Sequence, residues 1–298
     1  MEWTRWQKSP WGQPILIGLS WDLAWVALAA GGVIIAAHLA LYHWRLRVAN
    51  AKEAEIAPDV LRSLPERILR HSLPSRLFHW TMAASVLTLL LTAFLPIAGI
   101  KFSWVAPHWI AGFVLTAAIA FHVIHTTLWK RLGLIWVTAE DIRRGWSMVR
   151  TLLDARAPAP GKPGKNPVEN KLFHHGVAAA ALAAIGTGLV MMAKVDTPWW
   201  RRNPFLLSED AWGIVYVVHG IGSVALITLI LVHFYFALRP EKWWITLSML
   251  RGWISREHYL ARHDPLRWAP EPMPSRAARP GAATRAAERS APNRKAER

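Results

Sequence analysis

Two short stretches of this chain have nearly the same sequence. Residues 76–79 read Arg-Leu-Phe-His, and residues 171–174 read Lys-Leu-Phe-His. Each stretch begins a long apolar segment, and a second apolar segment follows each of them. The similarity continues inside the segments, where Thr92 corresponds to Thr187. A duplicated pair of apolar segments predicts a four-helix bundle in which equivalent helices are parallel.

The same repeat places histidines at matching positions. His108 and His122 correspond to His219 and His233, and both pairs have a spacing of 14 residues. A helix turns about 100° and rises about 1.5 Å per residue, so the two histidines of each pair share one face and lie about 21 Å apart. This spacing suits two sites stacked across one membrane.

The apolar segments are long enough to cross a bilayer, which takes about 20 residues of helix. With 53% hydrophobic residues and a mean hydropathy of +0.19, the composition excludes an ordinary water-soluble protein. The first segment is too long for a secretory signal, and we interpret it as a retained span with Asp22 near its outer end. The predicted spans are 14–43, 78–98, 108–129, 172–193 and 213–238, and none contains Lys or Arg.

The net charge of +16 follows the predicted topology. Segments 44–77, 130–171 and 239–298 carry 7, 9 and 13 of the 35 Lys and Arg residues. Short cytoplasmic loops are enriched in these residues, so the N-terminus is expected in the periplasm and the C-terminus in the cytoplasm of a bacterial inner membrane. Membrane topology accounts for most of the charge, so we expect membrane lipid and no nucleic acid as a partner.

This topology divides the chain into consecutive parts. We predict an all-α membrane protein, with a four-helix transmembrane bundle and one additional N-terminal transmembrane helix. Most of the connecting segments are basic, and the last is too poor in large apolar residues to form a core. The parts are an N-terminal anchor helix (1–45), a cytoplasmic connector (46–77), the bundle (78–240), a juxtamembrane segment (241–268) and a disordered basic tail (269–298).

The histidines within the spans are the candidate metal ligands, because the chain has no Cys to ligate an iron–sulfur cluster or attach a c-type haem. His108 and His219 pair under any scheme, since both lie near the outer ends of parallel helices. His233 lies deeper and has two possible partners, His122 or His79. Intramembrane ionisable residues are costly and usually functional.

Other residues receive weaker assignments. Small residues beside the ligands, namely Gly112, Gly220 and Gly222, are expected to leave room for a flat macrocycle. We expect the remaining span histidines, His38, His43, His125 and His175, to face headgroups or packing partners. His71, His258 and His263 are expected on the cytoplasmic surface.

Residues 70–268 resemble the cytochrome b (gamma) subunit of membrane-bound respiratory formate dehydrogenase. The similarity rests on residues 76–80 (Arg-Leu-Phe-His-Trp), 107–112 (Pro-His-Trp-Ile-Ala-Gly) and 232–235 (Val-His-Phe-Tyr). It continues through 251–255 and 263–268. Related cytochrome b subunits serve nickel–iron hydrogenases and thiosulfate reductases. The chain differs from the usual pattern in its additional N-terminal span, a short outer loop at 100–107 and a histidine at position 122.

The resemblance implies two haems b with histidine axial ligands. By residue matching, His79 pairs with His233 on the inner side, and His108 pairs with His219 on the outer side. The resemblance also implies a quinone, menaquinone or ubiquinone, near His233 and the start of the fourth bundle helix, where Asn170 is the candidate contact.

The same resemblance implies partner subunits. These are an iron–sulfur subunit at the periplasmic face and a catalytic molybdenum or tungsten subunit. The chain would then pass electrons inward to the quinone. A different class of protein remains open from the residues alone, namely a transporter subunit whose histidines relay protons or pack the bundle.

Overall fold

The computed structural model describes residues 2–48, 64–129, 135–154, 156–157 and 161–269. Within these residues, five helices are long and apolar enough to cross a membrane. They are α1 (Asp22–Val48), α3 (Leu73–Phe94), α4 (Val105–Trp129), α6 (Val168–Met191) and α7 (Glu209–Leu238). The helical architecture with one additional N-terminal helix is therefore confirmed. The predicted tail, 269–298, lies almost entirely outside the described residues.

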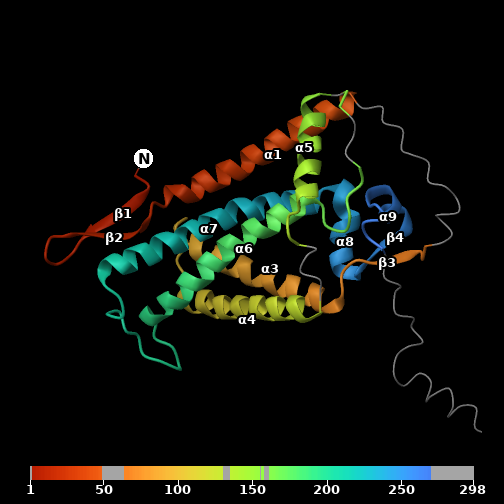
Figure 1. The fold of residues 1–298 in the computed structure, drawn as a ribbon. Helices are drawn as coiled ribbons and strands as arrows, with labels where there is room; N and C mark the ends of the chain where they lie inside the picture. The colour runs from red at the N-terminus through yellow and green to blue at the C-terminus, as the bar shows by residue number, and fades with distance from the viewer. Residues whose placement is uncertain (1, 49–63, 130–134, 155, 158–160, 270–298) are drawn as a thin grey trace, which may run out of the picture.

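The four later spans form the bundle in two antiparallel pairs. Helix α3 packs along α4, and α6 packs along α7 (Figure 1). A Cβ at Gly222 of α7 would lie 2.8 Å from the carbonyl oxygen of Ala180 in α6, so only glycine permits this close approach of the two backbones. Helix α1 lies outside the bundle and packs along α7.

The first predicted span, 14–43, is wrong at its start. Residues Pro14–Leu19 form strand β2, which pairs with β1 (Thr4–Lys8) in an antiparallel hairpin, and the helix begins only at Asp22. Gly12, with φ of +84°, makes the turn that folds β2 back onto β1. Since β1 supplies backbone partners, this apolar stretch is a strand instead of the first turns of the helix. Leu16 and Leu19 of β2 then pack against Gly213 and Gly220 of α7.

A small unit closes the opposite end of the bundle. Strand β3 (Arg67–Leu69) pairs with β4 (Trp253–Ser255), next to α8 (Trp243–Arg251) and α9 (Arg256–Arg262). The predicted connector and juxtamembrane segment therefore share one sheet, which the sequence did not indicate. Its buried apolar side chains are Ile68, Ile254, Tyr259, Leu260 and Trp268. We refer to this as the α8–α9 end and to the other as the hairpin end (Figure 1).

His263 is buried in this unit, with 3% of its surface exposed, so its expected place on the surface is wrong. Its Nδ1 lies 2.9 Å from the carbonyl oxygen of Gly164, and its Nε2 lies 3.1 Å from Nη1 of Arg70. A carbonyl only accepts and an arginine only donates, so the ring is neutral with its proton on Nδ1. Burial, together with the Arg70 guanidinium, lowers the pKa of His263 to about 4.

Helix α5 (Ala139–Leu153), within the segment expected as a connecting loop, runs across the α8–α9 end of the helices (Figure 1). It begins with a capping box between Thr138 and Asp141. Lys171, at the start of α6, donates to the Asp141 carboxylate at 2.7 Å. Burial raises the pKa of Asp141, but the bonds from Lys171 and Thr138 outweigh this effect and hold it below its usual value.

Candidate functional site

The hairpin end of the bundle brings two histidines together from α4 and α7. The ring centres of His108 and His219 are 6.4 Å apart, and the rings are inclined by 61°. Metal–imidazole bonds are about 2 Å long and the ring centre lies about 1 Å farther, so imidazoles on opposite sides of one metal have centres about 6 Å apart. The observed spacing matches this arrangement.

Two threonines orient these rings. Thr92 Oγ1 lies 2.8 Å from Nδ1 of His108, and Thr187 Oγ1 lies 3.1 Å from Nδ1 of His219. Each hydroxyl already donates its one proton to a carbonyl in the preceding turn of its own helix, Thr88 O or Ala183 O. The hydroxyls must therefore accept a hydrogen bond from Nδ1–H. This leaves the Nε2 lone pair of both rings for a metal.

Small residues lie around this pair, although not all of those expected. A Cβ at Gly188 would lie 3.3 Å from Cε1 of His219, so glycine allows α6 to approach the ring closely. A Cβ at Gly112 would meet only Leu89, at 4.0 Å, which is consistent with the predicted room. The prediction is wrong for Gly220 and Gly222, because these residues pack against Leu19 of β2 and against α6.

A second pair lies at the α8–α9 end, between α3 and α7. The ring centres of His79 and His233 are 6.3 Å apart, with an interplanar angle of 53°. Phe173 of α6 stacks on His233 at 5.5 Å. Nδ1 of His79 is buried and has no hydrogen-bond partner among the described residues. The rings are therefore spaced as in the first pair, but His79 lacks an orienting hydroxyl.

His122, the alternative partner of His233, has other neighbours. Its ring stacks on Phe78 at 4.2 Å and lies 6.3 Å from the ring of His174. The structure thus brings His233 next to His79 and brings His122 next to a histidine of α6. Asn170, the candidate quinone contact, is exposed in the first turn of α6, three residues before Phe173.

The four histidines are suitable ligands for haem iron. Each pair offers two imidazoles from different helices, and a porphyrin supplies the four remaining nitrogens itself. In the described part of the chain, no three His, Asp or Glu side chains gather where they could hold a bare metal ion. His108 with His219, and His79 with His233, are the residues that would hold the iron.

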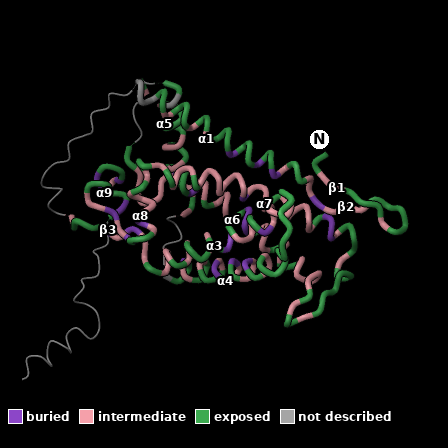
Figure 2. Tube along the Cα trace, turned by 180° about the vertical axis from the view of Figure 1, so that it is seen from behind, coloured by how far each residue is buried: buried purple, intermediate pink, exposed green. Residues whose placement is uncertain are grey.

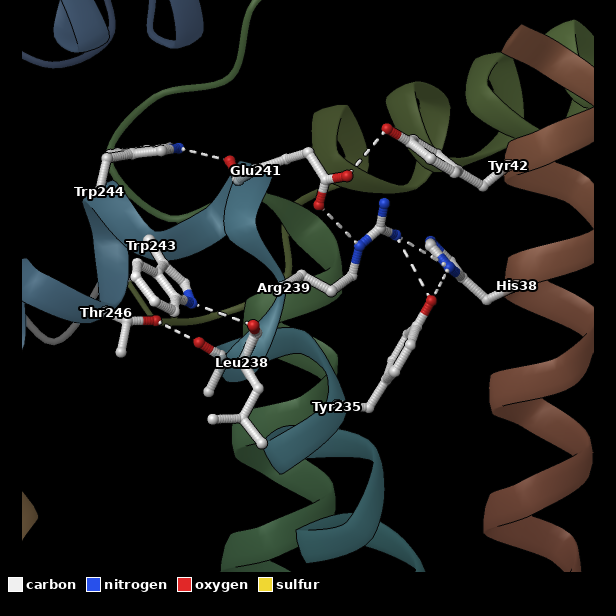
Figure 3. Close-up of polar contacts among 10 residues, drawn as sticks. His38, Tyr42, Tyr235, Leu238, Arg239, Glu241, Trp243, Trp244 and Thr246 are labelled. Carbon is white, nitrogen blue, oxygen red and sulfur yellow. Dashed lines mark hydrogen bonds and ion pairs between the residues drawn. The ribbon is translucent and has the colours of Figure 1, made fainter. Parts of the chain in front are cut away.

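A polar network ties α1 to the end of α7, and sequence reasoning missed it (Figure 3). His38 Nδ1 lies 2.9 Å from the hydroxyl of Tyr235, which is two residues after His233, and 3.2 Å from Nη1 of Arg239. The Arg239 guanidinium also lies over the ring of Tyr42, 4.1 Å from its centre. The sequence did not indicate a role for Tyr42 or Tyr235, because their contacts join α1 to the end of α7 and these segments are far apart in the sequence.

Glu241 completes the network from the short 3-10 turn Pro240–Lys242, which joins α7 to α8. Its carboxylate accepts hydrogen bonds from Arg239 Nε and the Tyr42 hydroxyl, both at 3.1 Å. The hydrogen bond from Arg239 is the main reason that the pKa of Glu241 is lowered to about 2. Burial lowers the pKa of Arg239, but its bond to Glu241 outweighs that effect and raises the pKa above its usual value. Both groups are therefore charged at neutral pH.

Many large apolar side chains of the long helices are exposed. Figure 2 shows exposed residues along most of α1, which has bundle contacts on only one side. Such a surface suits lipid, since large apolar faces are rare on soluble monomers.

Comparison with known proteins gave one family. Residues 70–252 match the family model described as prokaryotic cytochrome b561, and this range contains all four bundle helices and both histidine pairs. Helix α1 and the hairpin lie before it. No curated protein matches the chain significantly.

Proposed function

Because the chain belongs to the prokaryotic cytochrome b561 family, a family of multi-pass membrane electron-transfer proteins that carry haem b, we propose that it holds two haems b in one electron path. His108 and His219 ligate the haem at the hairpin end. His79 and His233 ligate the haem at the α8–α9 end. The observation that carries the proposal is that α7 contributes one histidine to each of two pairs with the same ring spacing.

The chain's own residues prepare these sites. Bound haem iron supplies one-electron redox chemistry. Thr92 and Thr187 hold the Nδ1 protons of the hairpin-end pair, which keeps Nε2 available and increases the basicity of each imidazole. Helix α6 packs along α7, which carries one histidine of each pair.

The direction of electron flow follows from the proposed orientation. The described parts of the basic segments lie at the α8–α9 end, so this end faces the cytoplasm of a bacterial inner membrane and the hairpin faces the periplasm. Electrons enter from an iron–sulfur subunit at the hairpin end and reach menaquinone or ubiquinone near His233. Asn170 is the proposed quinone contact on α6.

The partner complex proposed first is a respiratory formate dehydrogenase with a molybdenum or tungsten subunit. A hydrogenase or thiosulfate reductase is the second candidate, because the family match covers the bundle and does not include the hairpin that would meet the partner. Co-purification of the native complex identifies the donor: a molybdenum or tungsten subunit that oxidises formate supports the first, a nickel–iron subunit supports a hydrogenase, and a subunit that reduces thiosulfate supports a thiosulfate reductase.

The experiment that tests the haem ligands is a haem count on the purified protein. Reduced-minus-oxidised spectra should show b-type bands, and His108→Ala, His219→Ala, His79→Ala and His233→Ala should each contain one haem fewer than the wild type. His43→Ala, which changes an exposed histidine of α1, should retain the wild-type count. A colourless wild-type protein after expression with ample haem would refute the proposal. A full count in His79→Ala would refute its pairing with His233.

A further inference from the structure

Helix α5 is amphipathic, and its apolar face is exposed. Ile142, Trp146, Val149 and Leu153 follow one another at intervals of four, three and four residues, so they form one stripe along the helix. Ile142 is 64% exposed, Trp146 65% and Leu153 81%. This apolar stripe therefore has no cover from the described part of the chain.

Helix α5 does not cross the membrane itself. Its 15 residues extend over about 22 Å. A spanning helix needs about 20 predominantly apolar residues, and α5 is not among the five helices with that character. Five of its residues are charged, namely Glu140, Asp141, Arg143, Arg144 and Arg150. Helices with a charged side and an apolar side lie in the plane of a membrane surface.

The contacts of α5 with α6 place it at the level where the spanning helices begin. A Cβ at Gly145 would lie 3.7 Å from Cγ1 of Val168, which is the first residue of the span of α6. One turn earlier, Asp141 forms its ion pair with Lys171. Since α5 runs across the ends of the helices, it follows the edge of the spanning region (Figure 1).

Two arginines border the apolar stripe. Arg143 precedes Trp146 by three residues and Arg150 follows it by four, so both lie next to this indole on one side of α5. Both are exposed, and neither forms an ion pair with a carboxylate among the described residues. Arginine binds phosphate oxygens, and its long side chain reaches from an apolar boundary to a headgroup.

These observations favour lipid over a protein subunit as the cover of the stripe. The membrane that the bundle crosses lies at the level of α5, because α5 contacts the first residue of a span. Its surface offers both acyl chains for the stripe and phosphates for Arg143 and Arg150.

We propose that α5 is an interfacial helix that binds anionic phospholipid at the α8–α9 end. The apolar stripe enters the boundary between headgroups and acyl chains, and Arg143 and Arg150 bind lipid phosphates. This contact holds the connection between α4 and α6 against the membrane. The inference requires only that the bundle crosses a membrane, so it does not depend on the haem ligands.

The test uses spin labels on the full chain, which has no Cys of its own. Val149→Cys and Ile142→Cys each carry a label on the stripe. Ser147→Cys is the control, because position 147 lies about 160° around the helix from position 149. The proteins are reconstituted in vesicles of phosphatidylethanolamine and phosphatidylglycerol. Electron paramagnetic resonance then measures collisions with oxygen, which partitions into lipid, and with a water-soluble nickel chelate.

Both stripe labels should show a ratio of oxygen to nickel collisions several times that of the control label. In the labelled Val149→Cys protein, the double change Arg143→Gln and Arg150→Gln should lower this ratio by about twofold. Vesicles of phosphatidylcholine alone should lower it in the same way. Arg156→Gln, which changes an exposed arginine beyond the end of α5, should leave the ratio unchanged.

Equal ratios for the stripe and control labels, or stripe labels that collide mainly with the nickel chelate, would overturn the inference. Stripe labels shielded from both reagents would also overturn it, because a protein surface would then cover the stripe. A ratio that ignores the arginines and the phosphatidylglycerol would refute the recognition of anionic lipid. The haem content of the same samples tests the proposed function separately, since neither result determines the other.

Discussion

The two ends of the bundle hold their histidines in different ways. At the hairpin end, Nδ1 of both rings meets a threonine hydroxyl, and glycine lets α6 approach His219. At the α8–α9 end, Nδ1 of His79 is buried without a partner among the described residues. The polar groups there lie instead in the network of Arg239 and in the unit around His263.

The difference indicates how each end maintains its site. Hydrogen bonds to Nδ1 orient an imidazole before the metal arrives, so the hairpin-end pair is preorganised by the helices themselves. The other pair depends on its cofactor and on the packing of the α8–α9 end. Substitutions in the helices should therefore change the haem affinity of the hairpin-end site. A change of pH should instead change the stability of the α8–α9 end.

The largest expected effect is the pH dependence of the α8–α9 unit. The pKa of His263 is about 4 in the folded chain, below its ordinary 6.5, so the unfolded state binds more protons between these values. The stability of the unit should be complete above pH 6.5 and should fall by up to about 3 kcal/mol as the pH drops toward 4. Urea titrations of tryptophan emission at pH 7.5 and pH 5 measure this loss.

His263→Gln, which keeps a donor and an acceptor, is the matched variant for that titration. It should lower the stability slightly at pH 7.5 and show a smaller change between the two pH values. An unchanged pH response in His263→Gln would assign the effect to other groups.

The next effect concerns the orienting hydroxyls. Thr92→Val removes the hydroxyl that accepts from His108 Nδ1–H, which should lower the haem affinity of the hairpin-end site by about 10- to 100-fold and raise its midpoint potential. Thr187→Val should have a smaller effect, because the Ala184 carbonyl oxygen also lies 3.0 Å from His219 Nδ1. Haem transfer to an apoprotein acceptor and a redox titration measure the two changes. Thr116→Val is the control, because the Thr116 hydroxyl donates to Gly112 O within α4. Equal shifts at both ends would contradict the assignment.

A smaller effect is expected from one methyl group on α6. Gly188→Ala would place a Cβ 3.3 Å from Cε1 of His219, so the ring must move by a few tenths of an ångström. We expect a few-fold weaker retention of the hairpin-end haem, measured by the same transfer assay. Gly186→Ala, where a Cβ meets nothing within 4 Å, should behave as the wild type. If the two variants are indistinguishable, close approach at Gly188 is unimportant.

The smallest effect should come from the attachment of α1. Tyr235→Phe removes the hydroxyl that bonds to His38 and should cost about 1 kcal/mol or less. A decrease of a few degrees in the thermal midpoint, with an unchanged haem content, is the expected result. A lost haem in Tyr235→Phe would show that the network supports the His79 and His233 site directly.

Much of the fold could be predicted because membrane helices have strong local signals. The apolar segments located all five helices to within a few residues at most of their ends, except for residues 14–19, which are a strand. That stretch has the same composition as a helix start, and only its pairing with Thr4–Lys8 distinguishes it. The sheet of β3 and β4 was missed because its strands are short and far apart in sequence.

The candidate site was predicted in part for the same reason. The 14-residue spacing placed two histidines on one face of α7, but the choice between His79 and His122 as the neighbour of His233 depended on how helices from the two copies meet. The Thr92 and Thr187 match was visible as a repeat, yet its role required the distances to Nδ1.

By itself, the amino-acid sequence determined the five long apolar helices apart from the start of the first, the duplication of the last four, and which face of each carries histidine, since all three depend on neighbours along the chain. Tertiary structure decided which rings meet, which tautomer His108, His219 and His263 adopt, and that His122 lies next to His174 as His233 lies next to His79. All of these features depend on contacts between side chains of different helices. Helix periodicity fixes the direction in which a side chain points, but it does not fix which side chain of another helix it meets.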